Sequence, residues 1–335
     1  MNSRERVIQT LTRGAADRPP VMEMGIDWAV MHGLGYRSFP EMIEGLNLDG
    51  VSVNQMLYTL GWRRWIMPHI RNYTDEWGVK SRMTGELLPI PVEHPIPTSD
   101  HLKGYHPPLP RKNPLLKAIS HARRRFPDRA VTVVSRNDFA ASWFLCGMDV
   151  LMISFLNEPD FADSLFAMVS EYYCELYRLC LRAGADVIYL TDDYAYKTGT
   201  LMSREHFKRF ILPWLKKGVK AIHDEGGLCI KHSDGDLSGI LDLIADAGFD
   251  GIGPLEPAAG NDLISLRRKL GEEITLVGNI DVDLLSRGSA EEVSAVCTAL
   301  MNGMTPGGRF ILSSGNTITA AVNPDNFRVM VETGR

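Results

Sequence analysis

Residues 228–237 read LCIKHSDGDL, an apolar run that gives way at His232 to ionisable and small polar residues. The same change occurs at 187–193, VIYLTDD, behind a helical pattern over 160–183. Short apolar runs that alternate with amphipathic helical segments predict parallel strands joined by helices. Eight such runs occur along the chain, at 21–24, 51–53, 131–135, 187–190, 228–231, 251–253, 275–278 and 310–312.

Eight strands, most of them followed by a helix, predict a (β/α)8 TIM barrel. A length of 335 residues allows either two domains or one large barrel, and the strand count favours a single domain over 1–335. A doubly wound sheet would alternate in the same way, but the first strand is not followed by the GxGxxG pattern of a dinucleotide-binding fold.

One stretch interrupts this alternation. Residues 62–110 are rich in proline and tryptophan and are expected to form an insertion between the second and third strands. Within it, residues 73–96 predict a hairpin followed by an extended excursion. The insertion is either a surface feature or a lid over the mouth of the barrel, since long loops on this side often shape a substrate pocket.

Composition narrows the class of function. The chain has 36 basic and 41 acidic residues, a net charge of −5, so no basic excess exists to hold a nucleic acid or an anionic membrane. No run approaches the length of a membrane span, and the start MNSRERVIQT has no apolar core of a signal peptide. Five scattered cysteines without a CxxC pair are typical of reduced thiols in a cytoplasmic protein. A small-molecule enzyme is therefore expected.

The candidate catalytic residues follow the fourth and fifth strands, because a TIM barrel carries its site at the C-terminal ends of its strands. They are His232, Asp234 and Asp193. An imidazole at this position can bind a metal or transfer a proton near neutral pH, and the other interpretation of His232 is a structural hydrogen-bonding histidine. Asp236 is expected to cap a helix that begins at residue 237.

The candidate metal ligands are His232, Glu256 and Asp192, whose nitrogen and oxygen donors suit zinc or another divalent ion. Asp192 and Asp193 are adjacent and project in different directions, so one of the two is expected to face the ligand. Five further strand-end residues are expected to bind substrate: Met24, Asn54, Arg136, Asn279 and Asn316.

Long segments of the chain resemble the uroporphyrinogen decarboxylase-like superfamily, which includes the methylcobalamin:coenzyme M and corrinoid-protein methyltransferases. The resemblance implies a (β/α)8 barrel, in agreement with the strand count. It is carried by RERVIQTLTRGAADRPPV (4–21), AGADVIYLTDDYAYKTGTLMSREHFKRFILPWLKK (183–217), KHSDGDL (231–237) and GGRFILSSGNTI (307–318), among others.

The two branches of this superfamily differ in their site residues. The decarboxylase branch carries an arginine-rich segment after the first strand, whereas VMEMGIDWAVMHG (21–33) contains no arginine. The methyltransferase branch binds zinc with a His-x-Cys pair after the fifth strand and a cysteine after the eighth. The matching positions here are His232, Asp234 and the region of Asn316, so both thiolates are missing. A metal site with oxygen ligands is the remaining expectation.

The resemblance therefore implies a methyltransferase of the O-demethylase type. It would move a methyl group from a small methoxylated or methylated substrate to a corrinoid carried by a partner protein. Two other interpretations stay open: a decarboxylase or lyase of a small carboxylated substrate, in which Arg136 would pair with the carboxylate, and a ligand-binding homologue without catalysis. Either form of the enzyme could be a monomer or a homodimer.

Overall fold

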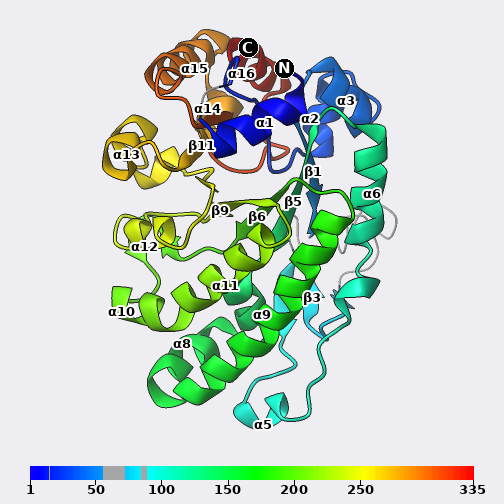
Figure 1. Ribbon diagram of the computed structural model, residues 1–335, viewed down its shortest axis with the longest axis vertical. Helices are drawn as coiled ribbons and strands as arrows, with labels where there is room; N and C mark the ends of the chain where they lie inside the picture. Colours follow the sequence, from blue (N-terminus) through cyan, green and yellow to red (C-terminus); the bar gives the residue numbers. More distant parts are fainter. Residues whose placement is uncertain (15, 56–71, 84–88) are drawn as a thin grey trace.

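The computed structural model describes residues 1–14, 16–55, 72–83 and 89–335. Seven parallel strands form its main sheet, and helices cover the outside of this sheet (Figure 1). The sheet order is β1 (Gly50–Asn54), β5 (Ala130–Arg136), β6 (Val187–Thr191), β9 (Leu228–His232), β10 (Gly251–Ile252), β11 (Thr275–Ile280) and β12 (Phe310–Ser314).

The expected first strand, 21–24, forms an isolated parallel bridge between Val21 and Leu312. The Met22 N–H donates to the Leu312 carbonyl at 3.2 Å, and the Asp49 N–H donates to the Val21 carbonyl at 2.9 Å. This segment thus lies between β12 and β1 and joins the two edges of a sheet that has a TIM-like barrel form. It is no longer than a bridge for two reasons. The preceding prolines, 19 and 20, have no N–H to donate, and beyond the bridge the Ser314 N–H donates to the Glu23 carboxylate and not to a backbone carbonyl.

The helices begin where the sequence places their caps. The side chains of Ser203, Ser289 and Asn323 each accept a backbone N–H from the first turn of the helix that follows. The helices are α1 (Ser3–Thr12), α2 (Trp28–Gly33), α3 (Phe39–Gly45), α5 (Ser99–Leu102), α6 (Leu115–Arg125), α7 (Asp138–Cys146), α8 (Met148–Asn157), α9 (Pro159–Arg182), α10 (Arg204–His206), α11 (Leu212–His223), α12 (Leu241–Ala245), α13 (Leu263–Leu270), α14 (Val282–Arg287), α15 (Ala290–Met304) and α16 (Pro324–Thr333).

The helix predicted from residue 237 was wrong at its start. In the structure α12 begins at Leu241, and Asp236 accepts the Ser238 N–H at 2.9 Å in a turn before it. Gly239 lies in this turn, and glycine disfavours a helix because it loses the most backbone freedom.

No single helix in the described ranges is long and apolar enough to cross a membrane. Helices α7 and α8 reach that length and composition only as a pair, and the chain bends by 100° between them.

The described part of the predicted insertion contains a small antiparallel sheet of β2 (Asn72–Thr74), β3 (Lys80–Arg82) and β4 (Ile90–Glu93). The pairing of β2 with β3 confirms the predicted hairpin. Trp77 lies in the turn of this hairpin and contacts Tyr172 of α9 edge to face, with ring centroids 4.5 Å apart. Residues 62–71 and 84–88 of the insertion lie outside the described residues, so its role as a lid stays a prediction. A second hairpin, β7 (Ala195–Tyr196) with β8 (Gly199–Thr200), follows β6.

The interior of the ring is filled by one apolar cluster. Its members come from the segment 21–24, from β5, β6, β9, β11 and β12, and from α1. Side chains from strands on opposite sides of a ring can meet only inside it, so these residues mark the inward face of each strand. Val7 and Leu11 of α1 belong to the same cluster, and α1 therefore covers the N-terminal end of the ring. The C-terminal end is left for the site.

Three aspartates at the N-terminal end of the ring share one arrangement. Each aspartate directly precedes a strand and makes two hydrogen bonds to one residue of the neighbouring strand or segment. Its backbone N–H donates to the carbonyl of that residue, and its carboxylate accepts the N–H of the same residue. The carboxylate bonds join Asp49 to Val21 at 2.9 Å, Asp186 to Val131 at 2.9 Å and Asp250 to Cys229 at 2.7 Å. We refer to these three as the aspartate clamps.

The clamps differ in the cation that pairs with each carboxylate. Asp49 is paired with Arg6 and Arg18 at 2.6 and 2.9 Å. Asp186 is paired with Arg4 at 2.9 Å and also with Arg123. The cationic partner of the third clamp is a histidine, as described below.

Asp186→Asn tests the clamps. Asparagine keeps an acceptor for the Val131 N–H but removes the charge that the two arginines neutralise. We therefore expect the free energy of unfolding to fall by about 2–4 kcal/mol. The measurement is denaturant unfolding followed by circular dichroism. Asp242→Asn is the matched control, because Asp242 pairs with Arg204 on the surface and such pairs contribute less than about 1 kcal/mol. Equal losses in the two variants would contradict a special role for the clamp.

Candidate functional site

The inward face of each strand places most of the predicted site residues at the mouth of the ring. Met24 is itself a member of the interior cluster, and His232, Arg136 and Asn279 lie two residues beyond the members Ile230, Val134 and Val277. Since side chains alternate along a strand, these residues share the inward side. Asn54 ends β1 and follows the outward-facing Val53, so its side chain also points inward.

His232 is buried at the end of β9. Its Nδ1 lies 3.0 Å from the Pro254 carbonyl oxygen, which can only accept, so this nitrogen carries a proton. Its Nε2 lies 3.3 Å from Oδ1 of Asp234. A lone pair on Nε2 would repel this carboxylate, and therefore a proton or another cation belongs between the two atoms.

The electrostatics of this pair agree with that geometry. Burial alone would lower the pKa of His232, but the hydrogen bond and charge of Asp234 raise it above its ordinary value. For Asp234, burial acts to raise the pKa, yet the contacts with His232 and Asn316 lower it overall. Both shifts favour the charged pair of imidazolium and carboxylate.

Two further carboxylates lie next to this pair. Donor atoms of Asp193, His232 and Asp234 all lie within 4.8 Å of one another, and Asp193 accepts the Asp234 N–H at 3.0 Å. The Asn316 amide donates to Asp234 at 2.9 Å and to Glu256 at 3.2 Å. Five predicted site residues are thus in one place, which we call the mouth cluster: Asp193, His232, Asp234, Glu256 and Asn316.

Asp192 is directed elsewhere. Its carboxylate accepts the Ala140 N–H at 2.8 Å and the Phe139 N–H at 3.3 Å, both in the first turn of α7. The Tyr194 hydroxyl also donates to it at 2.8 Å. Asp192 thus satisfies N–H groups in the first turn of α7, whose own N-cap residue, Asn137, makes no side-chain capping bond. Asp192 therefore lies outside the mouth cluster, and Asp193 is the member of the adjacent pair that the geometry offers as a metal ligand.

Comparisons with known proteins place the chain in a family. The uroporphyrinogen decarboxylase (URO-D) profile matches residues 68–335. The chain belongs to the URO-D family.

This URO-D family member is similar in sequence to curated decarboxylases and similar in fold to a solved methyltransferase. It is 29% identical over 184 residues to uroporphyrinogen decarboxylase of Chlorobium luteolum, covering 52% of this chain and 49% of the relative. The same enzyme of Chlorobium chlorochromatii is 28% identical over 182 residues, so the chain spans about half the length of these curated relatives. A methyltransferase from Methanosarcina mazei has the same fold, with a TM-score of 0.75, 20% identity and coverage of 100% of this chain and 98% of that one.

The other predicted substrate-binding residues have different surroundings. The Asn279 amide donates to the carbonyls of Leu255 and Asn261 at 3.0 and 2.8 Å, and it thus holds the loop that carries Glu256. The guanidinium of Arg136 lies 3.7 Å from the ring centroid of Phe144, a cation–π contact at the edge of the mouth. Met24 is only 4% exposed and packs within the interior cluster.

Glu23 and Lys231 are buried charged groups that the strand pattern alone did not single out. Lys231 lies between two inward-facing residues of β9 and so faces the helices. Lys231 donates to the carbonyls of Leu190 and Asp192 at 3.1 and 3.3 Å, and burial lowers its pKa to about 8. Glu23 accepts the N–H and the hydroxyl of Ser314 at 2.8 and 2.5 Å, and burial raises its pKa to about 8.

Glu23→Gln should change how stability depends on pH. The folded pKa of Glu23, about 8, lies above the ordinary value of 4.5, so its stabilising effect is complete below pH 4.5 and is lost as the pH rises towards 8. Glutamine does not ionise, so the variant does not lose this stabilisation as the pH rises. We expect the difference in melting temperature, variant minus unchanged protein, to increase from pH 5 to pH 8. The measurement is thermal unfolding across that range. A constant difference would show that Glu23 titrates normally.

Proposed function

We propose that this URO-D family member is a methyltransferase that moves a methyl group from a small methoxylated or methylated substrate to a corrinoid carried by a partner protein. The observation that carries the proposal is the mouth cluster, where a buried histidine faces a carboxylate with two more carboxylates beside it. This site is anionic and rich in oxygen donors, and it lies at the end of the barrel where TIM-barrel enzymes carry out their chemistry.

The donor set suits a divalent ion such as zinc. His232, Asp234 and Asp193 would hold it, with Glu256 linked to them through Asn316. When bound, an ion with these hard ligands would polarise the oxygen or other heteroatom that carries the methyl group.

The side chains themselves have distinct roles in this proposal. When no ion is bound, the raised pKa of His232 would let its Nε2 instead supply a proton to the heteroatom from which the methyl group departs. Asn316 fixes Asp234 and Glu256 with one amide group, so that the two carboxylates keep their positions as charge develops.

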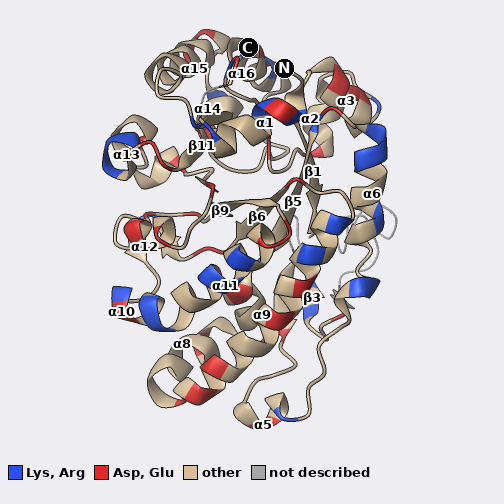
Figure 2. Ribbon diagram, viewed as in Figure 1, with Lys and Arg blue, Asp and Glu red and all other residues tan. Residues whose placement is uncertain are grey.

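The charge at the mouth argues against a substrate with many carboxylates. Three acidic members of the mouth cluster would repel it, while Arg136 is the arginine that ends a described barrel strand. Many of the other basic residues lie on outer helices such as α6, α10 and α13 (Figure 2). A neutral or cationic methyl donor fits this field better than a tetrapyrrole with several carboxylates does.

A second candidate is a decarboxylase or lyase of a small substrate with one carboxylate. The observation that favours it is the inward position of Arg136 at the end of β5, where a guanidinium can form a two-point contact with a carboxylate.

The test supplies cob(I)alamin in place of the corrinoid partner, with a panel of methoxylated and quaternary methylated donors. We expect the spectrum of cob(I)alamin to convert to that of methylcobalamin with at least one donor. His232→Ala should lower kcat/KM by about 100-fold or more, because it removes the side chain that holds the ion or, without an ion, supplies the proton. Asp246→Asn is the control and should leave the rate unchanged, since Asp246 pairs with Lys216 on the surface.

Other outcomes would contradict the proposal. Release of carbon dioxide from a carboxylated substrate, lost in Arg136→Met, would establish the decarboxylase instead. Thermal stabilisation by donors without turnover in either assay would indicate a binding homologue.

A further inference from the structure

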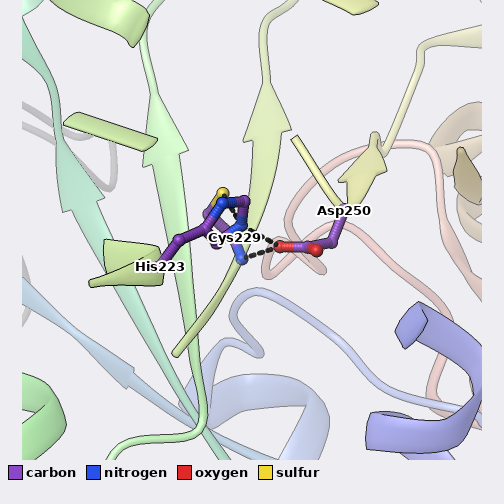
Figure 3. Close-up of side chains that lie close together, drawn as sticks. All are labelled: His223, Cys229 and Asp250. Carbon is purple, nitrogen blue, oxygen red and sulfur yellow. Dashed lines mark hydrogen bonds and ion pairs between the residues drawn. The ribbon is translucent and has the colours of Figure 1, made fainter. Parts of the chain in front are cut away.

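We propose that His223, Cys229 and Asp250 form a metal site for a divalent ion of the zinc type, at the end of the barrel opposite to the mouth cluster. His223 is the last residue of α11, Cys229 is the second residue of β9, and Asp250 directly precedes β10. The three side chains point toward one another from these elements (Figure 3). This site is independent of the proposed methyl transfer.

The donor atoms already lie close together. Nε2 of His223 is 3.0 Å from Oδ2 of Asp250 and 3.8 Å from Sγ of Cys229, and all donor atoms are within 4.8 Å of one another. A thiolate, an imidazole and a carboxylate are the three ligand types that zinc binds in proteins. Within the described ranges, this is the group of metal-ligand side chains that contains a sulfur, whereas the mouth group has only nitrogen and oxygen.

The comparison with the other two aspartate clamps supports the same conclusion. Asp49 and Asp186 each have two arginines as partners. In the described part of the chain, the ion-pair partner of Asp250 is His223 alone, which carries a charge only when it is protonated. A divalent ion would supply at the third clamp the permanent positive charge that arginine supplies at the other two.

The site is accessible from one side. The side chain of His223 is 39% exposed and that of Asp250 is 18% exposed, while Cys229 is buried beneath them. An ion can therefore enter past the imidazole and reach the sulfur, and a water molecule can complete a coordination of four. Binding exchanges the thiol proton of Cys229 for the metal ion and releases that proton to solvent. Oxidation states do not change.

Cobalt(II) distinguishes this site from the mouth cluster, because only a sulfur ligand gives a thiolate-to-cobalt charge-transfer band in the near ultraviolet. Chelator-treated, reduced protein is titrated with Co²⁺ alone, and we expect a band that saturates within two equivalents, since the mouth cluster can take up the second ion. The band should disappear in Cys229→Ser and should persist in Cys297→Ser, a matched change of another buried thiol. It should also persist in His232→Ala, which affects only the mouth.

A second variant keeps the test decisive if Cys229→Ser fails to fold. His223→Ala changes a half-exposed side chain and should weaken the band, while His121→Ala, on the exposed face of α6, should not. Zn²⁺ should likewise raise the melting temperature of the unchanged protein and of His232→Ala more than that of His223→Ala. The absence of a band in the unchanged protein, or an unaltered band in Cys229→Ser or His223→Ala, would overturn the proposal.

Discussion

Successive side chains of a strand point to opposite sides of the sheet, and in a ring this alternation decides which residues meet inside. Met22 and Met24 fill the interior, while the carboxylate of Glu23 between them bonds to Ser314 of β12. The same rule separates His232 from Lys231 at the end of β9. The position of the candidate site is thus a consequence of strand register, and register in turn depends on bonds between neighbouring strands.

The aspartate clamps provide such bonds at the N-terminal end of the ring. Each fixes one strand against its neighbour through two hydrogen bonds to the same residue, and α1 fills the interior beside them. The C-terminal ends of the strands carry the mouth cluster instead. The strand β9 contributes to both ends, with Cys229 on its outward face at one and His232 on its inward face at the other. Stability and chemistry are therefore separated along the same strand.

Much of this could be predicted from local sequence. Seven of the eight expected strands are present, because apolar runs bounded by polar residues report burial directly. The positions of His232, Asp234 and Glu256 followed from the rule that sites lie at strand ends. The five cysteines are free and buried, as expected.

The rest depended on contacts between distant segments. The sequence shows that Asp192 and Asp193 are neighbours, but it does not show which of them faces the site. That depends on where the first turn of α7 lies, because Asp192 accepts its N–H groups. The clamps and the group of His223, Cys229 and Asp250 escaped notice for the same reason: no motif links residues that meet only through the register of neighbouring strands. Glu23 is another case, because its burial is set by Ser314 at the far end of the chain.

The contrast between Asp192 and Asp193 tests most directly the claim that, of these two adjacent carboxylates, one stabilises the fold and the other serves the site. The measurement is the melting temperature of Asp192→Asn and of Asp193→Asn under identical conditions. The account predicts a loss of several degrees for Asp192→Asn, because one amide oxygen cannot replace both carboxylate oxygens toward Phe139, Ala140 and Tyr194. The buried Lys231 also loses a nearby negative charge. Asp193→Asn should melt close to the unchanged protein, because its side chain is exposed and asparagine can still accept the Asp234 N–H. Equal losses, or a larger loss in Asp193→Asn, would contradict it.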